Sequence, residues 1–532
     1  MEEHLIKVVM LHFFAKNRTL LFVLFCLIIK TSAGQLTVRE TQKLFLKADN
    51  VFEYGDYLGA LQIYKTIYPY DSTNSELNFK IGVCLYEIKK FRKSAVPYFE
   101  KTSKVDFPET YYYLGRLYHS QKKYEKALAC FSQFKNTKYD EGHSRKEIDD
   151  LIAKCNVAKF MESKEDRTLQ IKNLGDTINT EYPEYAPLIP AQENFMLFTS
   201  RRKNDSFTQT DPWGDYFEDI YISERKNKNW MNPKMLDTTI NTSVHDAGTG
   251  LSADGEKLLV YRTSKDLKSG DIYECDFINQ KWTLPAMLGK IVNEPEYLET
   301  SACYSPDGNT IFFSSNRPGG FGGKDLYLVK KLPNGNWGTP FNLGRSINTE
   351  YNEDAPFVHP AGDVLFFSSE GHENMGGYDI FKSTFDEAGK FKTPQNMGCP
   401  VNTVDDDIFF VLNTDASLGY LSSERDGGYG SQDIYSVYFP INNIPLNAYN
   451  IHVFDESGNV LTNVDILLTD MAKKTIYGMY KSNHNTGKIL VLSAPDISYR
   501  IAIQATGYEP YISNTTFGIN NELIFKLKKV QQ

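Results

Sequence analysis

The chain has 532 residues, of which 41% are apolar, 23% charged and 14% aromatic. This length predicts several domains, and the apolar and charged fractions are those of globular protein. The formal net charge is −9 and the chain has no strong basic run, which disfavours nucleic-acid binding.

Residues 1–34 have the pattern of a targeting segment. The run Leu20–Ile29 is apolar over ten residues, follows basic residues and precedes small ones. Ten residues are too few to span a bilayer, so a cleavable secretory signal peptide is predicted and no membrane-spanning segment is expected after cleavage. Met1 and Met10 both stay open as the start. We expect an exported protein, in the periplasm or associated with the outer membrane.

Cysteine usage predicts neither a lipid anchor nor a metal site. Phe25 stands before Cys26, where a lipobox needs a small residue. The cysteines of the mature chain are Cys84, Cys130, Cys155, Cys275, Cys303 and Cys399. Six cysteines permit fifteen disulfide connectivities, which stay open. No two are close enough in sequence to resemble a metal-binding pair.

Residues 36–165 are predicted to be helical. Gly82 and Gly115 lie 33 residues apart, and small residues at such positions let helices approach. The second glycine belongs to Leu114-Gly115-Arg116-Leu117-Tyr118, which is followed by Tyr124, Ala127 and Phe131. This spacing resembles the tetratricopeptide repeat, whose period is about 34 residues. We expect three repeats, a capping helix near 144–161, and a groove for a protein partner.

A longer repeat occupies residues 168–440. Its marker is an Asp-apolar-aromatic triplet that recurs in steps of 52, 54, 54 and 54 residues, with its aspartates at Asp219, Asp271, Asp325, Asp379 and Asp433. The fourth unit predicts strands at 355–359, 364–368, 379–383 and 391–397. Four short strands per unit predict a five-bladed β-propeller. The segment 168–175 resembles a fourth strand and is predicted to complete the last blade.

The third unit reads Ser305-Pro306-Asp307-Gly308, then Ile311-Phe312-Phe313 and Asp325-Leu326-Tyr327. It resembles the WD40-like PD40 repeat of TolB-type propellers. The repeated aspartates have two interpretations, a ring that binds a cation or sugar, or turn caps that bind backbone amides within each blade. The second is favoured, because a residue present in every blade more often builds the blade.

Residues 446–530 are predicted to form a separate β domain. The runs Ile451–Asp455 and Val464–Leu468 flank the turn Glu456–Asn459. The stretch Tyr499–Ile503, followed by Ala505-Thr506-Gly507-Tyr508, resembles the carboxypeptidase regulatory-like fold, a transthyretin-like β-sandwich. The whole chain is therefore predicted to join a tetratricopeptide α-solenoid, a five-bladed β-propeller and a β-sandwich.

Acids that differ between blades follow the Ile-Asn-Thr marker at one end of the predicted barrel. They are Glu181, Glu184, Asp246, Glu299, Glu353, Asp354, Asp405, Asp406 and Asp407. A glycosidase needs two facing carboxylates, but these acids largely recur in register, which disfavours an enzyme. Instead we expect binding by exposed loops, with Glu353, Asp354, Asp405, Asp406, Asp407, Phe321 and Met375 as candidates. No catalytic, cofactor-binding or metal residue is predicted.

The domain order is similar to that of multidomain envelope proteins of Bacteroidota that usually end in an OmpA-type peptidoglycan-binding domain. Some of them serve type IX secretion and gliding. This chain stops at Gln532 without such a segment. The resemblance implies a non-catalytic scaffold that binds envelope proteins, including secretion or outer-membrane components, and a glycan or peptidoglycan as a further ligand. A glycosidase-like enzyme and a carbohydrate-binding module stay open as alternatives.

Overall fold

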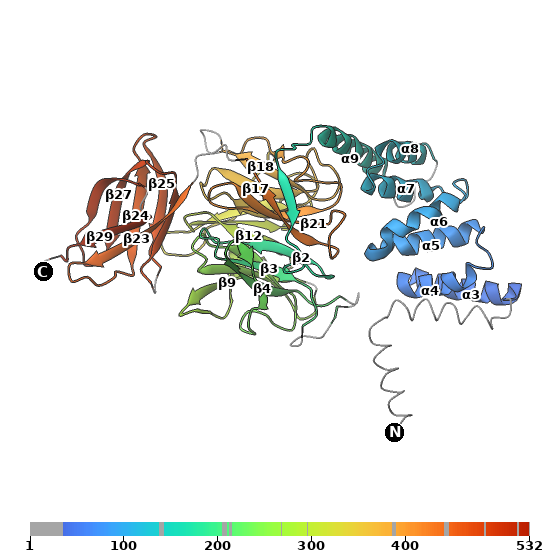
Figure 1. Ribbon diagram of the computed structural model, residues 1–532, viewed down its shortest axis with the longest axis horizontal. Coiled ribbons are helices and arrows are strands. Elements are labelled where there is room, and N and C mark those ends of the chain that lie inside the picture. The colour runs from blue at the N-terminus through green and yellow to red at the C-terminus, as the bar shows by residue number, and fades with distance from the viewer. Residues whose placement is uncertain are drawn as a thin grey trace, which may run out of the picture. The chain divides into compact units, whose positions relative to one another are not determined.

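The computed structural model describes residues 36–137, 143–204, 210–211, 215–267, 269–294, 296–385, 390–440, 446–483, 486–518 and 521–530. The predicted signal peptide, residues 1–34, lies outside this range. The chain forms two compact units, one of residues 1–117 and 129–142, the other of residues 118–128 and 143–532. The described part is mostly β-sheet with eight α-helices, and Figure 1 labels many of these elements.

The first unit is helical. Its elements are α3 (Val38–Glu53), α4 (Tyr57–Ile67), α5 (Ser75–Glu87), η1 (Lys89–Ala95), α6 (Val96–Lys101) and parts of α7 (Glu109–Ser120) and α8 (Tyr124–Lys135). A capping box starts α3, in which the amide of Thr37 donates to Glu40 Oε2 at 2.8 Å and the amide of Glu40 donates to Thr37 Oγ1 at 3.3 Å. Such caps satisfy amides that have no partner inside the helix.

Two glycines let these helices pack closely. A Cβ atom on Gly82 would lie 2.8 Å from the ring of Phe99, and one on Gly115 would lie 2.5 Å from the ring of Phe131. Both rings are fully buried. The expected role of the small residues is therefore observed, because a larger side chain at either glycine would clash with an aromatic core residue.

The second unit contains five sheets of short antiparallel strands. The first sheet contains β2 (Glu184–Leu188), β3 (Phe195–Ser200), β4 (Asp219–Lys226), β5 (Asn229–Trp230) and β6 (Lys234–Met235), and the second contains β7 (Asp246–Leu251), β8 (Lys257–Thr263), β9 (Gly270–Ile278), β10 (Lys281–Trp282) and β11 (Ala286–Met287). The third contains β12 (Glu299–Tyr304), β13 (Thr310–Ser315), β14 (Asp325–Lys330) and β15 (Phe341–Asn342), and the fourth contains β16 (Glu353–Val358), β17 (Val364–Ser369), β18 (Asp379–Thr384) and β19 (Gln395–Asn396). The fifth contains β20 (Asp407–Leu412), β21 (Leu418–Ser423) and β22 (Asp433–Tyr438). The short helix α10 (Gly289–Val292) lies between β11 and β12.

The first strand of each sheet contacts the first strands of two other sheets. These contacts run from β2 to β7, then to β12, β16 and β20, and from β20 back to β2. The arrangement is a closed, propeller-like ring, which we call the sheet ring. Apolar residues of neighbouring sheets form shared core clusters, for example Leu188 and Leu197 with Leu258 and Val260.

The two ends of the sheet ring are joined by strand pairing. Strand β1 (Gln170–Asn173) pairs antiparallel with β22, with Gln170 opposite Tyr438 and Asn173 opposite Tyr435. The side-chain amide of Asn173 also donates to Asp433 Oδ2 at 2.7 Å. The prediction that the segment 168–175 supplies the missing fourth strand is confirmed. Closure of this kind removes an open sheet edge.

Residues 447–527 form two further sheets. One has the order β26 (Ile489–Ser493), β23 (Asn447–Asp455), β29 (Glu522–Leu527), and the other β25 (Thr475–Lys481), β24 (Val464–Asp470), β27 (Ser498–Ala505), β28 (Tyr511–Thr516). Their buried residues make one core that includes Tyr449, Ile466, Val491 and Phe517. This core is that of a small β domain.

Candidate functional site

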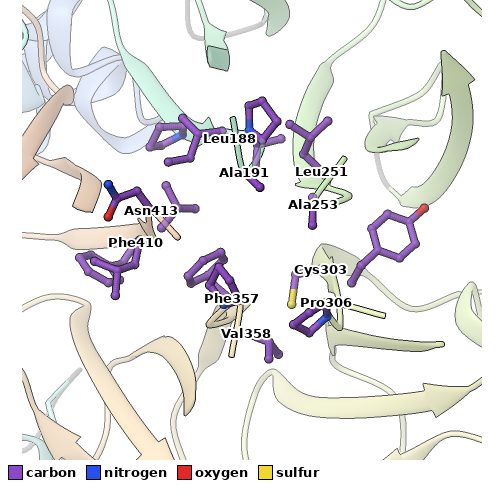
Figure 2. A pocket seen from close by; sticks show the side chains of 18 of the residues that line it. Leu188, Ala191, Leu251, Ala253, Cys303, Pro306, Phe357, Val358, Phe410 and Asn413 are labelled. Atoms are coloured by element: carbon purple, nitrogen blue, oxygen red, sulfur yellow. The ribbon is translucent and has the colours of Figure 1, made fainter. Parts of the chain in front are cut away.

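The centre of the sheet ring is a narrow apolar channel. The first strand of every sheet contributes to its wall, with Leu188, Leu251, Cys303, Val358 and Phe410 among the residues that face it (Figure 2). The cavity measures ≈ 70 Å³, and none of the described residues that line it is charged. Ligand pockets usually measure about 300–1,000 Å³. This channel is therefore too small to serve as a ligand pocket of the usual volume.

Each first strand begins at a fully buried carboxylate. These residues are Glu184, Asp246, Glu299, Glu353 and Asp407. Glu184 accepts hydrogen bonds from the amide and hydroxyl of Thr180 at 2.6 and 2.7 Å, and from the hydroxyl of Ser200 at 2.7 Å. The guanidinium of Arg202 donates to it as well, at 3.1 Å. A buried carboxylate bonded in this way fixes the start of its strand.

Two predicted site residues, Glu353 and Asp407, belong to this structural set. Asp407 accepts from the amide and hydroxyl of Thr403 at 2.6 and 2.8 Å, and from Arg425 at 2.7 Å. Glu353 has the equivalent threonine and serine bonds, but among the described residues no arginine or lysine pairs with it. Burial raises the pKa of Glu353. Both carboxylates hold the ring together and lie away from solvent.

Two of the repeated aspartates bind backbone amides of their own sheets. Asp325 accepts from the amides of Phe321 and Gly322 at 2.8 and 3.1 Å, and Asp433 accepts from the amides of Tyr429 and Gly430 at 2.6 and 2.9 Å. The interpretation that these aspartates bind backbone amides is confirmed for both.

Predicted loop residues have different surroundings. Asp354 is 5% exposed and is bonded by Lys324, by the hydroxyl of Ser301, and by the hydroxyl of Thr300 at 3.0 Å. Asp406 is partly buried and accepts from the amide of Tyr378 at 2.8 Å. Asp354 therefore acts inside the protein, contrary to the expected exposed loop, whereas Asp406 keeps partial exposure.

Two predicted residues keep some exposure. Asp405 is partly exposed, and its amide donates to Thr403 Oγ1 at 3.2 Å. Phe321 is partly exposed, and the guanidinium of Arg345 lies 4.6 Å from its ring centroid. The glycine that follows, Gly322, is exposed. Asp405 and Phe321, like Asp406, are therefore predicted site residues that keep partial exposure.

Met375 contradicts the expectation of an exposed binding loop, because its exposed fraction is 0%. It lies in one apolar cluster with Ala158 of helix α9 (Arg145–Ser163), Val404 and Tyr124. The Lys154 ammonium of α9 donates to the carbonyl of the neighbouring Gly376 at 2.8 Å. Helix α9 of the same chain thus covers this loop. The sequence pattern assigned that helix to the N-terminal helical domain.

Two groups of polar residues, which we together call the polar end, lie where first strands begin. One comprises Tyr185, Arg201, Glu218 and His245, and the other comprises Lys324 and Asp354. His245 Nδ1 lies 3.4 Å from Glu218 Oε2, and Lys324 forms an ion pair with Asp354. The carbonyls of Glu218 and Lys324 accept the amides of Asp246 and Glu353 at 2.9 and 2.8 Å. In both cases the third strand of one sheet therefore starts beside the first strand of the next sheet.

The charges of the polar end set the pKa values of its acids and tyrosines. Burial alone raises the pKa of Glu218, but His245, Tyr185 and Arg201 together hold it below its ordinary value. Burial alone would also raise the pKa of Asp354, but Lys324 and Ser301 lower it below its ordinary value. The pKa of Tyr185 is well above its usual value because of burial and the Glu218 carboxylate. Both carboxyls are therefore ionised at neutral pH.

Sequence reasoning missed most of the polar end. Glu218 and Lys324 each stand immediately before a repeated aspartate. Tyr185 and Asp354 each stand immediately after the buried acid that begins a first strand. The other sheets hold different residues at these two positions, such as Gly270 and Ala247. Variation at fixed positions of the repeat was the available signal.

Two further observations concern ions and membranes. Within the described ranges, no three His, Cys, Asp or Glu residues are placed to hold a metal ion. None of the described helices is long and apolar enough to cross a membrane.

Comparison with known proteins adds little to this geometry. No protein-family model matches the chain, and no curated protein matches it. An α-L-arabinofuranosidase from Lactobacillus brevis is 12% identical with a TM-score of 0.32, and the match covers 54% of this chain and 94% of that one. An endo-arabinase from Bacteroides thetaiotaomicron is 12% identical with a TM-score of 0.33, covering 51% and 97%.

A third match is the β-propeller domain of the Trilobed protease from Pyrococcus furiosus, which is 12% identical with a TM-score of 0.23 and covers 64% of this chain and 85% of that one. Likenesses of this strength carry no argument about activity. The description of the sheet ring rests on its own strand order and contacts.

Proposed function

We propose that the chain is a non-catalytic scaffold of the cell envelope, exported to the periplasm or the outer membrane. In this proposal the helices form a tetratricopeptide stack, the sheet ring is a five-bladed propeller, and the C-terminal sheets form a transthyretin-like sandwich. The stack and one face of the ring hold protein partners, among them components of type IX secretion or gliding machinery.

The observation that supports this proposal most is the pairing of charges at the polar end. Glu218 faces His245, and Asp354 faces Lys324. Charged groups held in fixed positions give an interface specificity and register when they complement charges of the partner. Residues that differ between the sheets gather there, and Lys324, whose side chain is 21% exposed, reaches solvent while the buried Asp354 holds it in place.

The same pairing disfavours a glycosidase. Hydrolysis of a glycosidic bond needs one carboxylic acid with a raised pKa as proton donor and a second carboxylate as base or nucleophile. At the polar end the pKa of Glu218 is lowered by its hydrogen bonds with His245 and Tyr185 and by Arg201, and the pKa of Asp354 is lowered by Lys324 and Ser301. Neither acid is therefore protonated at neutral pH, so neither is ready to donate a proton to a leaving group.

The test compares the wild-type chain with a double variant, Lys324→Gln with Asp354→Asn, which keeps side-chain size and removes the ion pair. The matched control is Lys226→Gln with Glu224→Gln, because that pair is joined at 2.9 Å and its side chains are 63% and 59% exposed. Each immobilised full chain is incubated with detergent-solubilised envelope fractions. Bound proteins are identified after crosslinking, and thermal melting confirms that all three chains are folded.

We expect the wild type and the control to retain the same envelope proteins and the Lys324/Asp354 variant to lose at least one of them. A second measurement follows the release of sugars from arabinan and peptidoglycan, for which we expect no turnover. Hydrolysis that disappears in the Lys324/Asp354 variant would overturn the proposal in favour of a glycosidase. Retention of glycan without any protein would identify a carbohydrate-binding module instead.

A further inference from the structure

The C-terminal β domain carries apolar side chains on the outside of its larger sheet, which has the order β25, β24, β27, β28 (Figure 1). Leu467 lies opposite Met479 on one side and Ala502 on the other, and Ala502 lies opposite Ile512. Met479 and Ile512 are 55% and 57% exposed, and Leu467 and Ala502 are partly exposed. We call these four residues the apolar row. It crosses all four strands of the sheet.

The apolar row cannot join the core of its own domain. Side chains alternate between the two faces of a strand, and the inward positions of the same strands, such as Ile466 and Ile501, already form that core. On the smaller sheet, by contrast, the exposed Ile524 lies opposite His452 and between Glu522 and Lys526. Single exposed apolar residues are ordinary, whereas a contiguous exposed group marks an interaction surface.

The apolar row is complementary to itself. A half-turn about an axis parallel to the strands, between β24 and β27, brings β25 of one copy over β28 of another. Met479 then faces Ile512, and Leu467 faces the smaller Ala502. The half-turn also keeps the strands of the two sheets aligned, as in face-to-face sheet packing. We propose that the chain forms a two-fold symmetric dimer through this face, in which a second copy covers the apolar row.

The polar residues beside the apolar row fit the same axis. Asp465 and Gln504 lie opposite each other on one side of the row, and Thr469 and Arg500 lie opposite each other on the other side. The half-turn places Asp465 of one copy against Gln504 of the other, and Arg500 against Thr469. Each charge therefore meets a neutral polar side chain, and no two like charges face each other.

A two-fold axis along the row itself is disfavoured by strand β25. Lys481 and Ile476 lie on opposite sides of Met479, opposite Asp465 and Thr469. That axis would place the Lys481 ammonium of one copy over Ile476 of the other. Covering a charge with apolar surface costs free energy, so the axis between β24 and β27 is the one that the side chains favour.

The size of the face sets the strength of the dimer. Four strands about 4.8 Å apart and about 23 Å long make a face of about 450 Å². A standard interface buries about 800 Å² on each partner. We therefore expect a dissociation constant in the micromolar range, with a monomer in dilute solution.

The experiment is sedimentation velocity of the chain without its predicted signal peptide, from about 1 to about 200 μM. We expect the wild type to pass from monomer to dimer over this range. Leu467→Glu should raise the dissociation constant at least tenfold. Ile524→Glu is the matched control, because Ile524 is 64% exposed on the other sheet of the same domain, and it should leave the constant unchanged. Thermal melting checks that each variant is folded.

A mixing experiment tests the axis. Met479→Lys and Ile512→Asp should each weaken self-association, whereas an equimolar mixture of the two variants should form dimers. In the mixed dimer the introduced lysine faces the introduced aspartate, and the second contact keeps the wild-type pair of Met479 and Ile512. Hydroxyl radicals should oxidise Met479 in the dilute wild type and spare it at about 200 μM.

Three results would overturn the proposal. A wild type that stays monomeric at the highest concentration excludes the dimer, and if Leu467→Glu then loses a captured envelope protein, that protein occupies the face instead. Equal dimerisation of Leu467→Glu and the wild type places the interface elsewhere. Failure of the mixed variants to associate rejects this axis. None of these results bears on the capture of envelope proteins by the Lys324/Asp354 pair.

Discussion

Asn179 binds both backbone polar groups of Ile434, 255 positions along the chain. Its side-chain amide donates to the Ile434 carbonyl at 2.9 Å and its side-chain oxygen accepts the Ile434 amide at 2.9 Å. Asn402 does the same for Ile380, at 2.8 and 2.9 Å. The asparagines Asn241, Asn293 and Asn348 do so for Ile220, Ile272 and Leu326. One amide side chain thus joins each sheet to the next.

Removing one of these side chains should destabilise the ring strongly. Asn179→Ala and Asn402→Ala each leave a buried amide and a buried carbonyl without this partner. We expect each to lower the free energy of unfolding by about 2–4 kcal/mol, measured by urea denaturation. Only Asn179→Ala should also speed amide hydrogen exchange in β1, because Asn179 holds the closing strand. Equal exchange in β1 for both variants would contradict this role.

Asp379 and Asp433 occupy equivalent positions but should respond differently to Asn. Asp379 Oδ2 accepts from Met375 and Asn396, both at 2.7 Å, while no described residue donates to its buried Oδ1. Asp433 uses both oxygens, and its Oδ1 accepts the amide of Gly430 at 2.9 Å. We expect Asp379→Asn to be neutral or stabilising at pH 7, and Asp433→Asn to cost about 1–3 kcal/mol. Thermal melts that rank the two variants in the opposite order would reject this assignment.

Asp219 should make the stability of the ring depend on pH. Burial, with a contribution from Asp246, raises the pKa of Asp219 to about 7, against about 3.9 in an unfolded chain. The folded state binds the proton more tightly between these values, so stability falls as pH rises from about 4 to 7. Asp219→Asn should remove this fall, worth about 2–4 kcal/mol. Urea midpoints at pH 4.5 and 7.5 measure it, and an unchanged difference between them would disprove it.

Disrupting the α9 contact should uncover Met375. Ala158→Glu places a charge in the apolar cluster, whereas Phe160→Glu changes a side chain on the same helix that is already 58% exposed. Hydroxyl-radical footprinting should find Met375 protected in the wild type and in Phe160→Glu, and oxidised in Ala158→Glu. Met479, which is 55% exposed, should be oxidised in all three. Protection of Met375 in Ala158→Glu would show that α9 does not cover it.

Strand positions were predictable because turn residues and alternating apolar residues are local signals. The third strand predicted for the fourth unit, at 379–383, matches the observed β18, Asp379–Thr384. Of the predicted strand 391–397, the structure has only the two-residue strand β19, Gln395–Asn396. An outer strand has a partner on one side only, so apolar residues there do not guarantee pairing.

The site was less predictable because burial depends on what packs on a loop from elsewhere. Met375 resembles Phe321 and Tyr429 in sequence, yet only Met375 lies beneath a helix that is more than 200 positions away. Glu353 and Asp354 are adjacent, but one completes a repeated hydrogen-bond pattern and the other pairs with Lys324. Nothing local in the sequence separates these outcomes.

Strand β1 lies before the first sheet in the chain and completes the last one. During synthesis, the ring therefore stays open until residue 438 has emerged, and strand β22 meets its final neighbour only then. A fragment starting at Ser163 keeps this neighbour, and a fragment starting at Asp176 exposes a bare edge that invites aggregation. The few residues between the helices and the ring thus decide whether the ring survives on its own.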